Sequence, residues 1–128
     1  MSSEKKIVLL IEDEPALQEA VKMKLEKEGV EVLVAGTGEK GLQILGEKKP
    51  NLVWLDVLLP GINGLEVLRR IREDEKSKDL PVVIVSVSSG EGKIKQAFTM
   101  NIIDYIIKSE YTLDNIVKKV KDILSQLP

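Results

Sequence analysis

Polar residues that can together handle a phosphoryl group directly follow four apolar segments of the chain. Carboxylates follow the first segment at Glu12 and Asp13, and Asp56 follows the third. The hydroxyl of Ser86 follows the fourth segment, and the ammonium group of Lys108 follows the last. Crowded carboxylates repel one another and favour a divalent cation with oxygen ligands, such as Mg²⁺. Hydroxyl, ammonium and metal hold phosphoryl oxygens, and a facing carboxylate can attack phosphorus.

Two missing residue types narrow the chemistry further. The 128 residues include no cysteine and no histidine, which excludes disulfide frameworks, cysteine nucleophiles, Ser-His-Asp catalysis and nearly all transition-metal sites. The net charge of −2 argues against a basic face for direct nucleic-acid binding. The apolar run at residues 7–11 is too short for a signal peptide or a membrane span. We therefore expect a soluble, cytoplasmic protein that contacts neither membranes nor nucleic acid directly.

Five strand-like segments alternate with five helix-like segments. The predicted strands cover residues 7–11, 30–35, 52–55, 82–85 and 102–107, and the continuous apolar run over 7–11 is typical of a strand buried on both faces. Apolar residues at helical spacing lie between and after them, with Pro15 in a first turn, Gly29 at a stop and Thr112 as a cap. We therefore predict one α/β domain over residues 1–128, a doubly wound (βα)5 fold. Its flavodoxin-like, five-stranded parallel sheet should have the order 2-1-3-4-5.

This strand order brings the polar residues to one edge of the sheet. In such sheets ligands bind at the carboxyl ends of the strands, where strands 1 and 3 diverge. Each residue alone has an ordinary explanation: acids favour a helix N-terminus, aspartate favours turns, and a lysine can extend from a strand end to solvent. Their conjunction at successive strand ends predicts a site.

The chain also resembles a known family, the receiver domains of two-component response regulators, over about residues 5–126. The segments that carry the resemblance are IVLLIEDEP, WLDVLLPGINGLEVL, PVVIVSVSS and DYIIKS. The resemblance implies that residues 1–128 form a receiver (response regulatory) domain, with no output domain in this chain. It also implies a signalling domain and not an enzyme, capable at most of self-phosphorylation from small donors and of slow self-dephosphorylation.

Roles for individual residues follow from this resemblance. Asp56 is the implied phospho-acceptor, and Ser86 and Lys108 are implied to contact the phosphoryl group. Ser86 and Tyr105 are the implied switch residues. The cofactor would be Mg²⁺, with Mn²⁺ as a substitute. The implied metal ligands are Glu12, Asp13, Asp56 and the backbone carbonyl of Leu58.

The leading functional hypothesis is phosphoryl acceptance by Asp56 from a phosphohistidine of a partner histidine kinase or phosphotransfer protein. The donor is external because the chain has no histidine. Phosphorylation would change the face formed by the fourth predicted helix, the fifth predicted strand and the fifth predicted helix (helix 4, strand 5 and helix 5). This face would then bind a downstream protein target or form a homodimer. The charged residues expected on this face are Lys93, Lys95, Asp104, Lys118 and Lys119.

Other functions remain open on the same fold. A phosphorylation-independent protein-interaction module is the main alternative, although the complete set of site residues argues against it. A phosphatase with a nucleophilic aspartate usually has a second Asp two residues on, where this chain has Leu58. A nucleotide site needs a phosphate-cradling loop after strand 1, where Glu12 and its acidic neighbours would repel phosphate.

Departures from the family pattern give local predictions. Ser109 replaces the usual proline after Lys108, and a non-proline cis bond costs about 3–4 kcal/mol, so we predict a trans Lys108–Ser109 peptide. Asn101 stands where a glycine is common, and asparagine tolerates the left-handed backbone conformation. Leu58 and Ser88 should flank the path of the water that removes the phosphoryl group. Because leucine cannot bind that water, we predict slow self-dephosphorylation.

Overall fold

The computed structural model describes residues 5–87 and 90–128. The strands are β1 (Ile7–Ile11), β2 (Glu31–Ala35), β3 (Leu52–Leu55), β4 (Val82–Ser86) and β5 (Asp104–Ile107). The helices are α1 (Pro15–Lys27), α2 (Gly38–Leu45), α3 (Gly64–Glu73), α4 (Glu91–Thr99) and α5 (Leu113–Ser125). A short 3₁₀ turn over Lys108–Glu110 joins β5 to the segment before α5.

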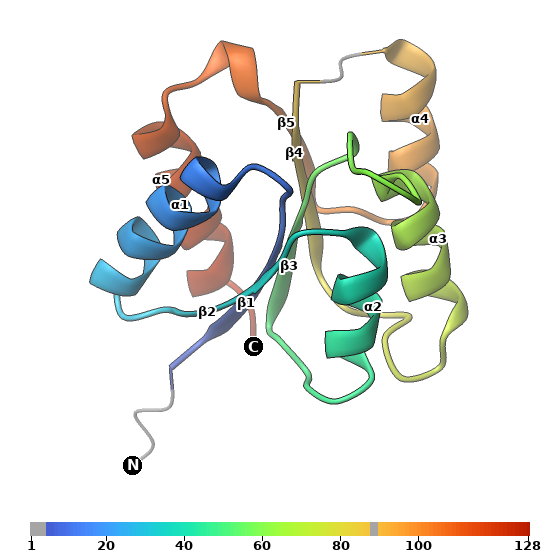
Figure 1. The fold of residues 1–128 in the computed structure, drawn as a ribbon, viewed down its shortest axis with the longest axis horizontal. Coiled ribbons are helices and arrows are strands. Elements are labelled where there is room, and N and C mark those ends of the chain that lie inside the picture. Colours follow the sequence, from blue (N-terminus) through green and yellow to red (C-terminus); the bar gives the residue numbers. More distant parts are fainter. Residues whose placement is uncertain (1–4, 88–89) are drawn as a thin grey trace.

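The five strands form one parallel sheet in the order β2-β1-β3-β4-β5, which confirms the predicted flavodoxin-like topology. Helices α1 and α5 cover one face of the sheet, and α2, α3 and α4 cover the other (Figure 1). Because all strands run in one direction, the loops that follow them lie along one edge of the sheet.

Two apolar cores lie on the two faces of the sheet. The core beneath α1 and α5 contains Trp54, the only tryptophan, which is fully buried. The core beneath α2, α3 and α4 contains Leu55 and Ile84. All residues of β3 and β4 are buried, as expected for central strands whose side chains enter a core on both faces. Because both faces of β3 and β4 are packed in this way, the carboxyl ends of these strands, which carry Asp56 and Ser86, are held in place.

Two predicted strands begin later than expected, for identifiable reasons. Val30 is not part of β2 because its N–H donates to Leu25 O at 3.1 Å, which ties it to the end of α1. β5 begins at Asp104 and not at residue 102, because the chain first turns at Asn101, whose φ of 60° is left-handed. The predicted conformation of Asn101 is thereby confirmed.

Arg72, near the end of α3, fastens the turn between α4 and β5. Its guanidinium donates to Met100 O at 2.7 Å and to Leu80 O at 2.8 Å. It also donates to Asn101 O at 3.3 Å and to Lys78 O at 3.2 Å. Burial lowers the pKa of Arg72, although the charge of Asp79 partly offsets this effect. One side chain therefore joins α3, the start of β4 and the end of α4.

The two ends of the described chain lie together at the amino edge of the sheet. The Lys6 ammonium donates to Leu127 O at 3.2 Å and to Pro128 O at 3.1 Å. Within residues 5–87 and 90–128, no helix is both long enough and apolar enough to cross a membrane.

Candidate functional site

Residues from the ends of three strands meet at the carboxyl edge of the sheet. Lys108, directly after β5, places its Nζ 2.7 Å from Glu12 Oε1 and 2.9 Å from Asp56 Oδ2. Glu12 follows β1 and Asp56 follows β3, so the strand order itself brings these groups together. Both carboxylates are buried, with 1% of Glu12 and 4% of Asp56 exposed. Buried carboxylates need a compensating charge, and Lys108 supplies one.

Asp13 completes an acidic cluster with Glu12 and Asp56. One carboxylate oxygen from each residue lies within 4.8 Å of those from the other two. Asp13 is exposed whereas the other two are buried, so the cluster opens to solvent on the side of Asp13. Several hard oxygen donors at this spacing, open to water, fit Mg²⁺ or Mn²⁺, which keep water ligands beside one or two carboxylates.

The electrostatics of the site are set by burial and by direct hydrogen bonds. Burial raises the pKa of the Glu12 carboxyl, and its hydrogen bonds to Lys108 and to the Glu14 N–H offset only part of this rise. Burial acts to lower the pKa of Lys108, but its hydrogen bonds to Glu12 and Asp56 outweigh burial and leave that pKa raised. Lys108 therefore remains an ammonium group at neutral pH.

The backbone around Asp56 holds its carboxylate in one orientation. The Asp56 N–H continues the sheet by donating to Ile11 O at 3.1 Å. One carboxylate oxygen, Oδ1, accepts the Leu58 N–H at 3.0 Å, and Oδ2 faces Lys108. Gly64, the first residue of α3, packs against this segment so closely that a Cβ would lie 2.1 Å from Asp56 O. Only glycine therefore fits beside the Asp56 backbone.

Ser86 and Tyr105 lie on the face of the sheet that α4 covers. Ser86 is the fully buried last residue of β4 and pairs with Ile107 of β5. Tyr105 pairs with Ile84, which faces the core beneath α4, and is itself half-buried against that core. Residues two apart in a strand share a face, so Ser86 points to the same side as Ile84. The two predicted switch residues are thus on one face, in adjacent strands.

The remaining sequence predictions fall around this edge. The Leu58 side chain is 48% exposed, and its N–H bonds Asp56 as described above. The Lys108–Ser109 peptide is trans, as predicted, and the described residues include no cis peptide bond. Ser88 lies outside the described residues.

The predicted output face is largely exposed. Lys93, Lys95 and Lys118 are exposed, whereas Asp104 and Lys119 are half-buried. The Lys119 ammonium lies 5.2 Å from the centre of the Tyr111 ring, a cation–π distance, so this lysine is engaged within the domain. Helix α4 buries only Ala97, whereas α3 buries five residues, so α4 is the more weakly packed helix.

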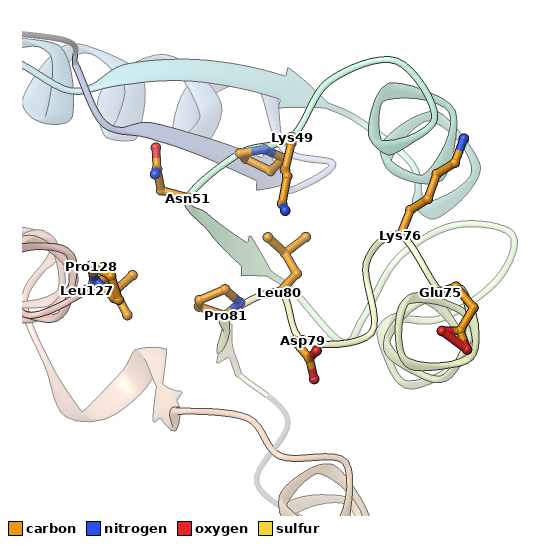
Figure 2. Close-up of a pocket in the computed structure, with 10 residues that line it drawn as sticks. Lys49, Asn51, Glu75, Lys76, Asp79, Leu80, Pro81, Leu127 and Pro128 are labelled. Carbon is orange, nitrogen blue, oxygen red and sulfur yellow. The ribbon is translucent and has the colours of Figure 1, made fainter.

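A groove of about 480 Å³ lies at the opposite, amino edge of the sheet, where Leu80, Pro81 and the chain end at Leu127 meet. Its charged side chains do not converge: Lys76 and Glu75 lie apart from Asp79 (Figure 2). None of its lining residues follows a strand at the carboxyl edge. We therefore place the candidate site at the acidic cluster and not in this groove.

Two residues that shape the site escaped the sequence analysis. Gly64 appears in that analysis only within the segment WLDVLLPGINGLEVL, and no residue type or spacing near it indicates its contact with Asp56. Gln18 donates to the carbonyl of Glu12 at 2.5 Å, and no pattern around it indicates this contact.

A five-stranded doubly wound sheet carries an acidic cluster and a lysine at its carboxyl edge, an arrangement that fits a receiver-type signalling domain. The chain matches the family model of the response regulator receiver domain over residues 8–121, and it belongs to that family.

Relatives and solved structures agree with this assignment. The transcriptional regulatory protein AfsQ1 of Streptomyces coelicolor is 38% identical over 101 residues, which cover 79% of this chain and 44% of AfsQ1. The response regulator TrrA of Thermotoga maritima, in complex with Mg²⁺ and BeF, is 33% identical with a TM-score of 0.78 over 92% of this chain and 98% of TrrA. The Mn²⁺-bound response regulator Rcp1 is 28% identical, with a TM-score of 0.82 over 96% of this chain and 99% of Rcp1. The chain spans about half the length of the curated relatives it matches, from 44% to 53%.

Proposed function

We propose that Asp56 accepts a phosphoryl group from the phosphohistidine of a partner histidine kinase or phosphotransfer protein, in a Mg²⁺-dependent reaction. The observation that carries this proposal is the buried Asp56 carboxylate, held 2.9 Å from Lys108 within an acidic cluster open to solvent. An Asp56 oxygen forms the new P–O bond while the P–N bond of the phosphohistidine breaks. The electron pair of that bond stays on the imidazole nitrogen, which then takes up a proton.

The metal would be held by the carboxylates of Glu12, Asp13 and Asp56 and by the backbone carbonyl of Leu58. Once bound, Mg²⁺, or Mn²⁺ in its place, neutralises the negative charge that phosphoryl transfer brings to the cluster. The Mg²⁺–BeF complex of TrrA and the Mn²⁺ complex of Rcp1 support this choice of ions.

Lys108 and Ser86 stabilise the transferred group. Lys108 already contacts Asp56 and needs only a small movement to reach a phosphoryl oxygen bound to it. Ser86, at the end of the neighbouring strand, moves its hydroxyl toward the same group. Tyr105 then fills the space vacated beside β5, on the face that both residues share. The weak packing of α4 supports a change in the surface formed by α4, β5 and α5.

We propose that this surface binds a downstream protein or a second copy of the chain, in the cytoplasm. One curated relative is named a DNA-binding response regulator. For the 128 residues here, the net charge of −2 favours protein contacts over direct contacts with nucleic acid. The domain itself performs at most self-phosphorylation from small donors and slow loss of the phosphoryl group.

Acetyl phosphate with Mg²⁺ tests the proposal through intact-protein mass. The wild type should gain one phosphoryl mass, Asp56→Asn should gain none, and the exposed control Asp122→Asn should behave as wild type. A mass gain that persists in Asp56→Asn would refute the site. Beryllofluoride with Mg²⁺ addresses the alternative, a phosphorylation-independent interaction module, which predicts the same partner binding with and without the trapped group.

A further inference from the structure

The loop between β1 and α1 carries Glu12 and Asp13, two of the three clustered carboxylates. Helices α2, α3 and α5 are each preceded by a residue whose side chain accepts a hydrogen bond from a backbone N–H in the first turn. These capping residues are Thr37, Asn63 and Thr112. Glu14, which precedes α1, makes no such side-chain hydrogen bond, and neither does Gly90 before α4. The loop before α1 is therefore held in a different way.

Gln18 closes this loop from within α1. Its backbone N–H donates to Glu14 O at 2.9 Å, as part of the first helical turn. Its side-chain amide turns back and donates to Glu12 O at 2.5 Å, across six positions of the chain. On the other side, the Glu12 N–H donates to Ala35 O at 3.0 Å. The backbone of Glu12 is thus bonded at both its N–H and its carbonyl.

The contact to the Glu12 carbonyl fixes the direction in which the chain enters Asp13. The carbonyl of Glu12 and the N–H of Asp13 belong to one planar peptide unit, so holding the oxygen holds the whole plane. The Glu12 carboxylate has partners of its own, because its oxygens accept from Lys108 and from the Glu14 N–H. Asp13 makes no hydrogen bond with any described residue. Its carboxylate is therefore positioned by the backbone alone.

We propose that Gln18 is a positioning residue for the metal site, which aims Asp13 at the cation through the Glu12–Asp13 peptide. This inference rests on the proposed Mg²⁺-dependent function. Mg²⁺ demands nearly ideal octahedral geometry, so a ligand with a freely rotating backbone contributes less. Groups that orient metal ligands without touching the metal commonly change metal affinity by about 10- to 100-fold when they are removed.

The test is the Mg²⁺ dissociation constant, measured by calorimetry on the whole chain. Gln18→Met keeps the length of the side chain but removes the donor, and it should weaken Mg²⁺ binding by about tenfold. Gln18→Ala is a second variant that favours the helix, and it should weaken binding to a similar degree. Gln43→Met and Gln43→Ala make the same changes at an exposed position of α2 and should bind Mg²⁺ as the wild type does.

A second measurement on the metal-free protein separates positioning from general loss of structure. Amide hydrogen exchange at Glu12, whose N–H donates to Ala35 O, should be faster in Gln18→Met, while exchange in the central strands β3 and β4 stays at the wild-type rate. Dissociation constants within about twofold of wild type in both Gln18 variants would overturn the assignment. Absence of Mg²⁺ binding by the wild type is a different result, which would overturn the proposed metal-dependent function and the role of Gln18 with it.

Discussion

The ammonium group of Lys108 lies 2.9 Å from Asp56 Oδ2, although the two residues are 52 positions apart in the chain. The pair is largely buried, with 19% of the Lys108 side chain and 6% of the Asp56 side chain exposed. Because Lys108 also contacts Glu12, one cation balances two buried carboxylates. This balance makes Lys108 both a structural group and a functional one.

Lys108→Met should lower the free energy of unfolding of the protein without Mg²⁺ by about 2–3 kcal/mol. This loss is smaller than that expected on removing one partner of a fully buried ion pair, because the ammonium group is partly exposed. Millimolar Mg²⁺ should stabilise this variant more than it stabilises the wild type, because the cation replaces the missing charge. Urea unfolding with and without Mg²⁺ measures both effects. Lys121→Met, which breaks an exposed pair with Glu28, should cost less than about 1 kcal/mol and show no added Mg²⁺ effect. An equal Mg²⁺ effect in Lys108→Met and wild type would contradict the charge balance.

Gly64→Ala should destabilise the domain by at least about 2 kcal/mol, because the new Cβ would meet Asp56 O at 2.1 Å and backbone must move. The same movement displaces the acceptor, so phosphorylation by acetyl phosphate should slow. Gly92→Ala is the matched control in α4, where a Cβ meets nothing within 4 Å. It should stabilise the protein by roughly 0.5 kcal/mol, because alanine favours a helix over glycine. Similar urea midpoints for the two variants would show that the predicted clash is absent.

The stability difference between wild type and Glu66→Gln should depend on pH. Hydrogen bonds from Arg69 and Arg70 lower the pKa of Glu66 from 4.5 to about 2. A carboxyl whose pKa is lower in the folded state stabilises that state above the unfolded pKa and loses this contribution as pH falls through the folded pKa. The advantage of the wild type should therefore be constant above pH 4.5 and shrink between pH 4.5 and 2. Because the pairs are exposed, high salt should reduce it at every pH.

Leu58→Asn should shorten the lifetime of the phosphorylated domain. The Leu58 side chain is 48% exposed beside Asp56 and cannot hydrogen-bond the water that attacks the acyl phosphate. One new hydrogen bond of about 0.5–1.5 kcal/mol in the transition state corresponds to a roughly 2- to 10-fold faster loss. The decay of the phosphoryl mass after removal of acetyl phosphate measures the rate. Leu58→Met, which adds no hydrogen-bond donor of this kind, should decay as the wild type does, and equal rates in all three proteins would refute the prediction.

Most of the fold could be predicted, because the apolar patterns in the sequence locate the strands and helices and the right-handed crossovers between parallel strands limit their order. The apolar run over residues 52–55 coincides with β3, and Thr112 caps α5 as expected from its position before an apolar helix. The start of β5 was wrong by two residues, because the apolar pattern continues through Ile102 and Ile103 while the backbone is still turning at Asn101. Apolar residues continue a strand pattern whether or not the backbone has yet become extended.

The site could be predicted to the level of which residues meet, because parallel strands carry their ends to one edge. Glu12, Asp56 and Lys108 are brought together in this way. The contacts of Gln18 with Glu12 and of Arg72 with Met100 could not be predicted. Each contact is a hydrogen bond from a long side chain to a backbone carbonyl, and it depends on the conformation of that side chain. No residue type or spacing in the sequence indicates such a hydrogen bond.

The hydrogen bonds from Lys6 to Leu127 O and Pro128 O bring the start of β1 beside the end of α5. A short linker from Pro128 to Lys5 could therefore close the backbone into a ring, and new ends could be opened in the turn between Gly46 and Lys49, which is exposed. Such a circular permutant would retain every strand, every helix and every residue of the site, and it would lose only the covalent connection between α2 and β3. It would also place both new ends at the amino edge of the sheet, far from the acidic cluster.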